Sequence, residues 1–143
     1  MASVTSPDTA SVSETLISLE TAALQRWGQG DPSGFLEISA PGVSYFDPFL
    51  ASRIDGLSAL SAYYDSIRGQ VHIDRFELLN PVVVSVAELA VLTFNFVSYS
   101  GAGLQRWNCT EVYRLTSVGW RIVQTHWSLV QPLNASSGSP TAA

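Results

Sequence analysis

The stretch Trp120-Arg-Ile-Val-Gln-Thr-His-Trp-Ser128 decides the fold of this chain. It predicts a strand, because two aromatic residues, three β-branched residues and a histidine fall within a length that a buried strand can span. Val118-Gly119 predicts the turn before this strand, and Gln131-Pro132 predicts its end. The rest of the chain can be interpreted as the material that covers the two faces of this strand.

The two faces of this strand follow from the alternation of side chains along an extended backbone. Trp120, Ile122 and His126 are expected on one face, and Thr125 and Trp127 on the other. Neither face is plainly polar. We therefore expect both faces to be covered, one by helices and the other by a second sheet or a second subunit.

Composition limits the classes of protein that this chain can belong to. Of its 143 residues, 46% are hydrophobic and 13% are charged, and the formal net charge is −5. The length suits one domain with a hydrophobic core, and the low charge indicates extensive burial. The negative net charge argues against a nucleic acid partner, because binding to nucleic acid requires clustered Lys and Arg. No apolar run reaches transmembrane length, so no membrane partner is expected.

The domain boundaries follow from composition as well. Residues 1–12 and 133–143 are rich in small and polar residues and predict flexible tails around a single domain over residues 13–132. The first residues lack the basic and apolar regions of a signal peptide, so a cytoplasmic location is expected. The single cysteine, Cys109, excludes an internal disulfide. The two histidines lie far apart, so no metal site is predicted, and no cofactor is expected.

The pattern of the chain changes from helical to extended near its middle. A capping box at Ser11–Glu14 predicts the start of a first helix, and Gly28 and Gly30 predict its end. Asp31-Pro32 predicts a short second helix, and Asp55-Gly56 a third that continues to about Arg68. The predicted strands are Val43–Asp47, a long stretch Val71–Val86 with a bulge or bend near Asn80-Pro81, Leu89–Tyr99, Leu104–Leu115 and the last strand.

This order of elements implies an α+β domain in which helices pack on one face of a curved antiparallel sheet. A strongly bent sheet wrapped over helices leaves a cone-shaped cavity, which is the natural place for a ligand.

Six short motifs, in order and at nearly constant spacing, carry a resemblance to a known superfamily. The motifs are Gly30-Asp31, Pro41-Gly42 through Phe46-Asp47-Pro48, Ile54-Asp55-Gly56-Leu57 with Tyr63-Tyr64, Asn80-Pro81, Glu111-Val112-Tyr113-Arg114, and Trp120-Arg121-Ile122-Val123 with His126-Trp127-Ser128. Together they resemble the nuclear transport factor 2-like superfamily. The chain is most similar to the association (hub) domain of calcium/calmodulin-dependent protein kinase II and its stand-alone bacterial relatives, and next to the SnoaL-like group.

The resemblance implies a cone-like, cystatin-like α+β fold that self-associates through its sheet as a homodimer. It implies no kinase activity, because the chain has no Gly-rich loop and no H-R-D or D-F-G segment. The arginines and histidine that line the hub pocket fall here at about Leu60, Phe96, Glu111 and Trp127, none of which is basic. The resemblance therefore implies a more apolar pocket, between the third helix and the sheet, that contains one acid.

Glu111 is the first candidate for site chemistry. It shares a strand face with Trp107, Cys109 and Tyr113, so its carboxyl should be partnered or have a raised pKa. It is interpreted either as a general base or ligand acceptor, or as the partner of an arginine in a structural ion pair.

Asp47 and His126 are the other two candidates for catalysis. Asp47 could abstract a proton or activate water at the cavity mouth, or it could be a turn residue that binds its own backbone. His126 could transfer protons near neutral pH, or it could be a structural residue at a sheet interface, which is the preferred interpretation. The remaining candidate ligand-binding residues are Tyr45, Leu60, Tyr64, Phe96, Trp107 and Trp127.

Three functions remain open at this stage. The leading hypothesis is a self-associating domain that binds a small hydrophobic ligand. The second is a cofactor-independent isomerase, dehydratase or cyclase that acts by acid–base catalysis, with Asp47 or Glu111 as base and His126 or a tyrosine as proton partner. The third is an oligomerisation domain whose cavity is filled by Trp107 and Trp127.

Overall fold

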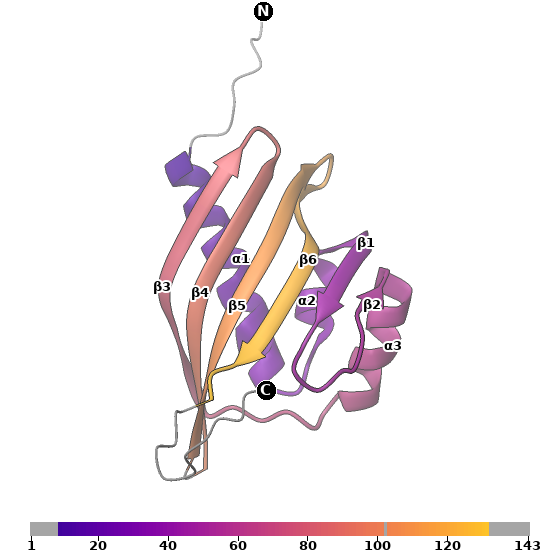
Figure 1. Cartoon of the computed structure of the whole chain (residues 1–143), viewed down its shortest axis with the longest axis vertical. Helices are drawn as coiled ribbons and strands as arrows, with labels where there is room; N and C mark the ends of the chain where they lie inside the picture. Colours follow the sequence, from indigo (N-terminus) through magenta and orange to yellow (C-terminus); the bar gives the residue numbers. More distant parts are fainter. Residues whose placement is uncertain (1–8, 102, 132–143) are drawn as a thin grey trace, which may run out of the picture.

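The computed structural model describes residues 9–101 and 103–131, which form three helices and one six-stranded sheet (Figure 1). The helices are α1 (Thr9–Gly28), α2 (Ser33–Glu37) and α3 (Leu57–Ile67). The strands are β1 (Ser39–Phe46), β2 (Ile54–Asp55), β3 (Arg75–Val86), β4 (Leu89–Ser100), β5 (Gly103–Thr116) and β6 (Gly119–Leu129). No helix among these residues is long and apolar enough to cross a membrane.

The N-terminal boundary differs from the prediction. Residues 9–12 were predicted as part of a flexible tail, but α1 already begins at Thr9, so Ser11 lies inside the helix instead of at its cap. Val12 is buried in the core, and this burial favours helix over tail. Residues 1–8 and 132–143 of the two predicted tails lie outside the described residues.

The sheet has the strand order β2-β1-β6-β5-β4-β3. Strands β3 to β6 form the predicted antiparallel meander. The predicted α+β fold is confirmed, and the sheet is mixed because β1 pairs with β6 in parallel. These two strands are far apart in the chain, so no tight hairpin requires them to run antiparallel.

The concave face of the sheet packs on α1, and α1 runs behind β3, β4 and β5 in Figure 1. Leu16 and Leu24 of α1 are almost fully buried against sheet residues such as Leu92, Tyr113 and Ile122. Val12, Leu16 and Leu24 are separated by four and eight residues, so they share the face of α1 that meets the sheet. This contact forms the hydrophobic core.

Irregularities in β3 and β6 change which of their side chains point inward. The register of β3 shifts between Leu79 and Val82, and Asn80 between them has a φ of 54°, which confirms the predicted bulge. In β6, Ile122 lies opposite Tyr113 of β5, and Gln124 lies opposite the preceding residue, Val112. Val123 therefore has no partner on β5 and forms a second bulge.

The bulge in β6 overturns the predicted faces of the last strand. Strict alternation placed Ile122 and His126 on one face, but Ile122 is fully buried on the inner face and His126 is exposed. The extra residue at Val123 reverses the alternation, so that Thr125 and Trp127 continue the inner face.

The ends of α1 and α3 are held together by two glycines. Gly30 has a φ of +85° and Gly69 a φ of +82°, both in the left-handed region that favours glycine. The Gly69 N–H donates to the Gly30 carbonyl at 2.9 Å, and a Cβ on Gly30 would lie 3.0 Å from the Gly69 Cα. This close approach places the end of α3 beside the end of α1, at the edge of the cavity described next.

Candidate functional site

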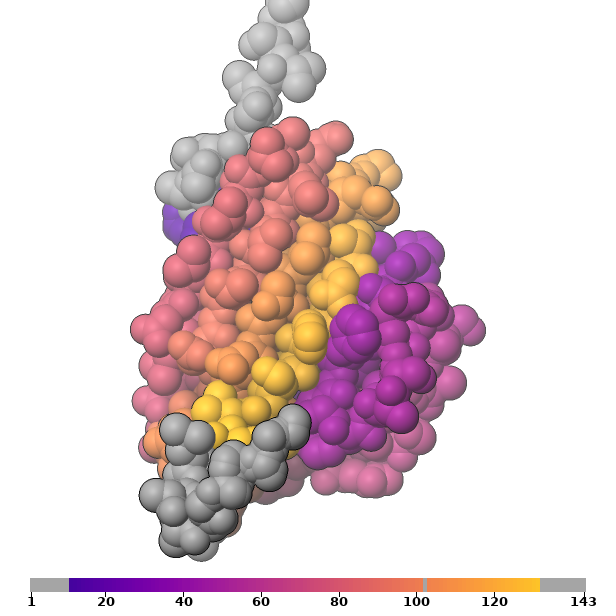
Figure 2. Space-filling model, viewed as in Figure 1, coloured from indigo at the N-terminus to yellow at the C-terminus, as the bar shows by residue number. Residues whose placement is uncertain are grey.

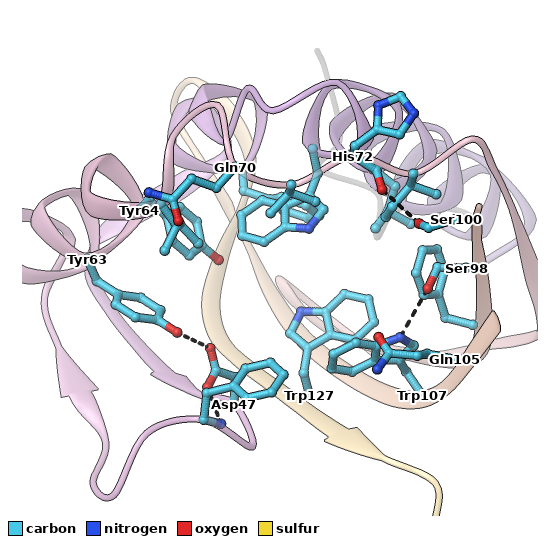
Figure 3. Close-up of a pocket in the computed structure, with 18 of the residues that line it drawn as sticks. Asp47, Tyr63, Tyr64, Gln70, His72, Ser98, Ser100, Gln105, Trp107 and Trp127 are labelled. Atoms are coloured by element: carbon cyan, nitrogen blue, oxygen red, sulfur yellow. Dashed lines mark hydrogen bonds between the residues drawn. The ribbon is translucent and has the colours of Figure 1, made fainter. Parts of the chain in front are cut away.

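A cavity of about 470 Å³ lies between α3, the C-terminal end of α1 and the concave face of the sheet. Figure 3 shows side chains from all of these elements around it. The lining residues come from the ends of the elements, so the cavity occupies one end of the sheet while the core fills the other. The lining residues include Trp27, Tyr45, Asp47, Phe49, Tyr63, Tyr64, Gln70, His72, Phe96, Ser98, Ser100, Gln105, Trp107 and Trp127.

Aromatic rings form most of the cavity wall. Trp127 contacts Phe96 and Trp107 edge-to-face, with ring centroids 5.5 and 6.0 Å apart. Trp27 and Tyr64 meet in the same way at 5.0 Å on the helical side. Such edge-to-face packing holds the rings in place and leaves their faces available to a ligand.

Asp47 is the carboxylate of this cavity. It directly follows β1, and its Oδ2 accepts hydrogen bonds from the Tyr45 hydroxyl at 2.9 Å and the Tyr63 hydroxyl at 2.7 Å. Its Oδ1 accepts the backbone N–H of Phe49 at 2.8 Å. Asp47 therefore binds its own turn, and it also lines the cavity; its role in proton abstraction or water activation stays a prediction.

The two tyrosines that bind Asp47 remain protonated at neutral pH. Burial is the main cause that raises the pKa of Tyr45 and of Tyr63 above the usual value of 10.0, and the nearby Asp47 carboxylate raises both further. Each hydroxyl is thus a donor committed to Asp47, and each oxygen keeps lone pairs that can accept.

A second, polar strip lies on the opposite wall. Ser98 of β4 is directly paired with Gln105 of β5, and the indole N–H of Trp107 donates to the Ser98 hydroxyl at 3.4 Å. The Ser100 hydroxyl donates to the backbone carbonyl of His72 at 2.7 Å. These contacts order the strip.

Six of the candidate residues chosen from the sequence line the cavity. They are Tyr45, Asp47, Tyr64, Phe96, Trp107 and Trp127. Leu60 and Glu111 do not line it, because Leu60 is buried in the core and Glu111 points into the filled half beneath α1. His126 lies on the outer face, with its ring centroid 4.9 Å from that of Phe46. His72 pairs with Asp74, with 2.7 Å between the His72 Nε2 and the Asp74 Oδ1.

Several lining residues were not singled out from the sequence. Ser98 and Ser100 continue the alternation that begins at Phe96, so the strand period alone could have identified them. Phe49 and Gln70 lie in loops, where no periodic signal applies. Trp27 lies in the last turn of α1, four residues after the buried Ala23, so the helical period places it on the apolar face.

Glu111 forms a fully buried pair with Glu20 of α1, a residue that sequence analysis did not single out. The Tyr113 hydroxyl donates to Glu20 Oε1 at 2.7 Å, and the Thr125 hydroxyl donates to Glu111 Oε1 at 2.5 Å. The Oε2 atoms of Glu20 and Glu111 have no hydrogen-bond partner. One carboxyl oxygen of each glutamate and the Cys109 Sγ all lie within 4.8 Å of one another. Glu20 lies four residues from both Leu16 and Leu24, and this helical spacing predicts that it shares their buried face.

Burial decides the protonation of this pair. It raises the pKa of Glu20 from 4.5 to about 7 and the pKa of Glu111 well above 4.5, and the mutual repulsion of the two acids raises the latter further. A protonated Glu111 can donate to Glu20, which would satisfy the second oxygen of each carboxyl. Glu111 is therefore paired with an acid, Glu20, and not with an arginine as one of its two interpretations expected.

Comparison with known proteins places the chain in a family. Residues 18–132 match the family of SnoaL-like domains. The chain is 44% identical to a candidate ketosteroid isomerase from Parabacteroides distasonis. The match covers 86% of this chain and 91% of the isomerase chain, and its TM-score is 0.78. The chain therefore belongs to the SnoaL-like domain family of the nuclear transport factor 2-like superfamily.

Two further solved structures share the fold. A calcium/calmodulin-dependent protein kinase II hub from S. rosetta is 18% identical, covers 91% of this chain and 100% of its own, and has a TM-score of 0.68. A candidate calcium/calmodulin-dependent protein kinase II association domain from Thiobacillus denitrificans is 22% identical. The match covers 80% of this chain and 94% of that chain, and its TM-score is 0.69. Comparison with curated proteins finds no match.

The Glu20–Glu111 pair predicts that stability falls as pH rises. A carboxyl whose pKa is raised in the folded state contributes fully below its unfolded pKa of about 4.5, and that contribution is lost as pH rises through the folded pKa, about 7 for Glu20. Each such group lowers the free energy of unfolding by about 1.4 kcal/mol per pH unit within its window. We expect this decline in urea denaturation between pH 5 and 8.

Glu111→Gln should make the decline shallower, because an amide can donate to Glu20 and accept from Thr125 without titrating. Glu14→Gln, on the exposed side of α1, is the matched control and should leave the slope unchanged. Equal slopes in the wild type and in Glu111→Gln would contradict proton sharing.

Proposed function

We propose that this domain binds a small, largely apolar molecule with one polar group in the cavity between α3 and the sheet. The observation that carries the proposal is the Asp47 carboxylate, held by Tyr45 and Tyr63 in a cavity that is otherwise mostly aromatic. Small-molecule sites typically combine about 300–1,000 Å³ of apolar volume with a few fixed polar groups. The cavity fits that description.

The roles of the lining residues follow from their chemistry. Phe96, Trp107 and Trp127 would supply apolar contact area, and Asp47 would orient the polar end of the ligand. The polar anchor first sought at Glu111 is thus proposed at Asp47, because Glu111 does not line the cavity.

Filling the cavity should abolish binding of an apolar probe. Ser98 is buried and lines the cavity, so Ser98→Phe places a ring inside it. We expect the neutral dye N-phenyl-1-naphthylamine to bind the wild type with enhanced fluorescence, and Ser98→Phe to weaken binding by about tenfold or more. Ser18→Phe, on the exposed face of α1, is the control and should bind like the wild type.

Circular dichroism would check that both variants are folded. Failure of the wild type to bind the dye, or equal binding by folded Ser98→Phe, would contradict the proposed site.

We infer that the domain also self-associates through the outer face of its sheet. No helix covers this face among the described residues, and Figure 2 shows it as a broad surface formed by β3 to β6. Val82, Val84, Val86 and Leu89 are exposed there at 42% or more. Relatives of the same fold are named as hub or association domains, which supports assembly.

A polar ladder crosses the same face. The Asn80 side chain donates to Asn95 at 3.0 Å, and Asn95 donates to Asn108 at 2.8 Å. Asn95 thus has its hydrogen-bond partners on the two neighbouring strands. An ordered amide row beside apolar residues suits a specific, self-complementary contact.

Light scattering should give a mass close to twice 15.4 kDa. Val84→Glu, which places a charge on a side chain 67% exposed on the sheet face, should shift the protein toward the monomer. Val118→Glu is matched in exposure at 68% but lies in the β5–β6 turn, and it should remain dimeric. A monomeric wild type at working concentration would contradict self-association.

Acid–base catalysis is the second candidate function. The convergence of Asp47 and Tyr63 at 2.7 Å supplies two polar groups at one point, and the relative that is 44% identical is named as a candidate ketosteroid isomerase. Glu111 and His126 lie outside the cavity, so Asp47 would be the base and Tyr63 the proton partner.

Hydrogen–deuterium exchange of a ketone tests this candidate. Asp47 would take the proton next to the carbonyl of 2-tetralone, and deuterium from the solvent would replace it. We expect faster exchange by NMR with the wild type than with Asp47→Asn, by a factor on the order of 10². Exchange at the buffer rate would contradict proton abstraction from such a ketone.

A further inference from the structure

The charge of the cavity is one-sided. All seven basic residues other than histidine are arginines, and none of them lines it. The His72 side chain is 77% exposed and paired with Asp74, and Figure 3 shows its ring directed away from Asp47 and the tryptophans. Asp47 is thus the charged side chain aimed into the cavity, and no cation among the described residues balances it there.

The hydrogen-bonding character around Asp47 is equally one-sided. The hydroxyl protons of Tyr45 and Tyr63 both go to Asp47 Oδ2, and the Phe49 N–H goes to Oδ1. A carboxylate has about four lone-pair positions, so one remains, along with the lone pairs of the two tyrosine oxygens. Around Asp47, this end of the cavity therefore offers three acceptor oxygens, which suit a ligand that donates hydrogen bonds.

Three donors near the other wall already have acceptors within the protein. The Trp107 N–H binds Ser98, the Ser100 hydroxyl binds the His72 carbonyl, and the Gln70 amide binds the Ser66 carbonyl at 3.1 Å. The other donors there, such as the Gln105 amide, are neutral, so an anionic ligand would meet the Asp47 carboxylate with no cation directed into the cavity by the described residues. The negative faces of the surrounding aromatic rings disfavour an anion and attract a cation.

We propose that the ligand of this cavity is an organic cation, an amine in its ammonium form attached to an aromatic or apolar group. The ammonium donates to Asp47 and the tyrosine oxygens, and the apolar group lies among Phe96, Trp107 and Trp127. This inference rests on the proposed function and narrows its ligand class.

The test compares three probes that share one ring and differ in charge. 1-Naphthylmethylamine is a cation at pH 7, 1-naphthalenemethanol is neutral and 1-naphthoate is an anion. We expect isothermal titration calorimetry to give the order amine, alcohol, naphthoate, with the amine bound about tenfold or more tighter than the alcohol, as a charge-assisted hydrogen bond predicts.

Asp47→Asn keeps the shape of the side chain and removes its charge. It should weaken amine binding by about tenfold or more and change alcohol binding by less than about threefold. Asp65→Asn is the matched control, because Asp65 is an exposed acid on α3 that does not line the cavity, and it should change neither. The order of the three probes on the wild type stands as a test even if Asp47→Asn fails to fold.

The outcomes separate this inference from the proposed function. If N-phenyl-1-naphthylamine binds but the amine shows no advantage over the alcohol, or the naphthoate binds most tightly, the cation is excluded and the cavity remains a binding site. If neither the dye nor any of the three probes binds, the proposed function itself fails.

Discussion

The packing of α1 against the concave face of the sheet is the constraint on which the rest of the structure depends. Leu16 and Leu24 are buried there, and Glu20 between them enters the same interface and meets Glu111. Two carboxyls without a balancing cation are tolerated in a core only if they hold a proton and keep their hydrogen bonds, which Tyr113 and Thr125 supply. The central helix contact therefore carries a titratable group at its centre.

The same contact explains why a cavity exists. The core fills one half of the concave face, and at the other half α1 ends near Gly30, where Gly69 holds the end of α3 beside it. Large aromatic side chains surround the remaining space without filling it, because their edge-to-face contacts brace them against one another. The third hypothesis, in which Trp107 and Trp127 fill the cavity, is disfavoured by the volume that remains.

The likeness to hub domains and to a candidate isomerase shows how little the fold alone says about chemistry. The function is decided by a few side chains in the cavity. Here these are an acid bound by two tyrosines and an aromatic wall, with no arginine among the lining residues, and the acid is Asp47 instead of the expected Glu111. The outer face adds a second surface, with exposed valines and an asparagine ladder, that is independent of the cavity.

The sequence by itself determined the α+β class, the meander and the bulge at Asn80-Pro81, because periodicity and turn residues act over a few positions. The resemblance to the superfamily indicated Phe96 and Trp127 as pocket residues, and both line the cavity. The sequence also showed that Glu111 must be partnered or protonated. Only the tertiary structure decided that its partner is Glu20, 91 residues away, and that the bulge in β6 separates His126 from Ile122. Strand register and helix-to-sheet contacts join distant segments, and one inserted residue reverses a face, so neither can be obtained from local patterns.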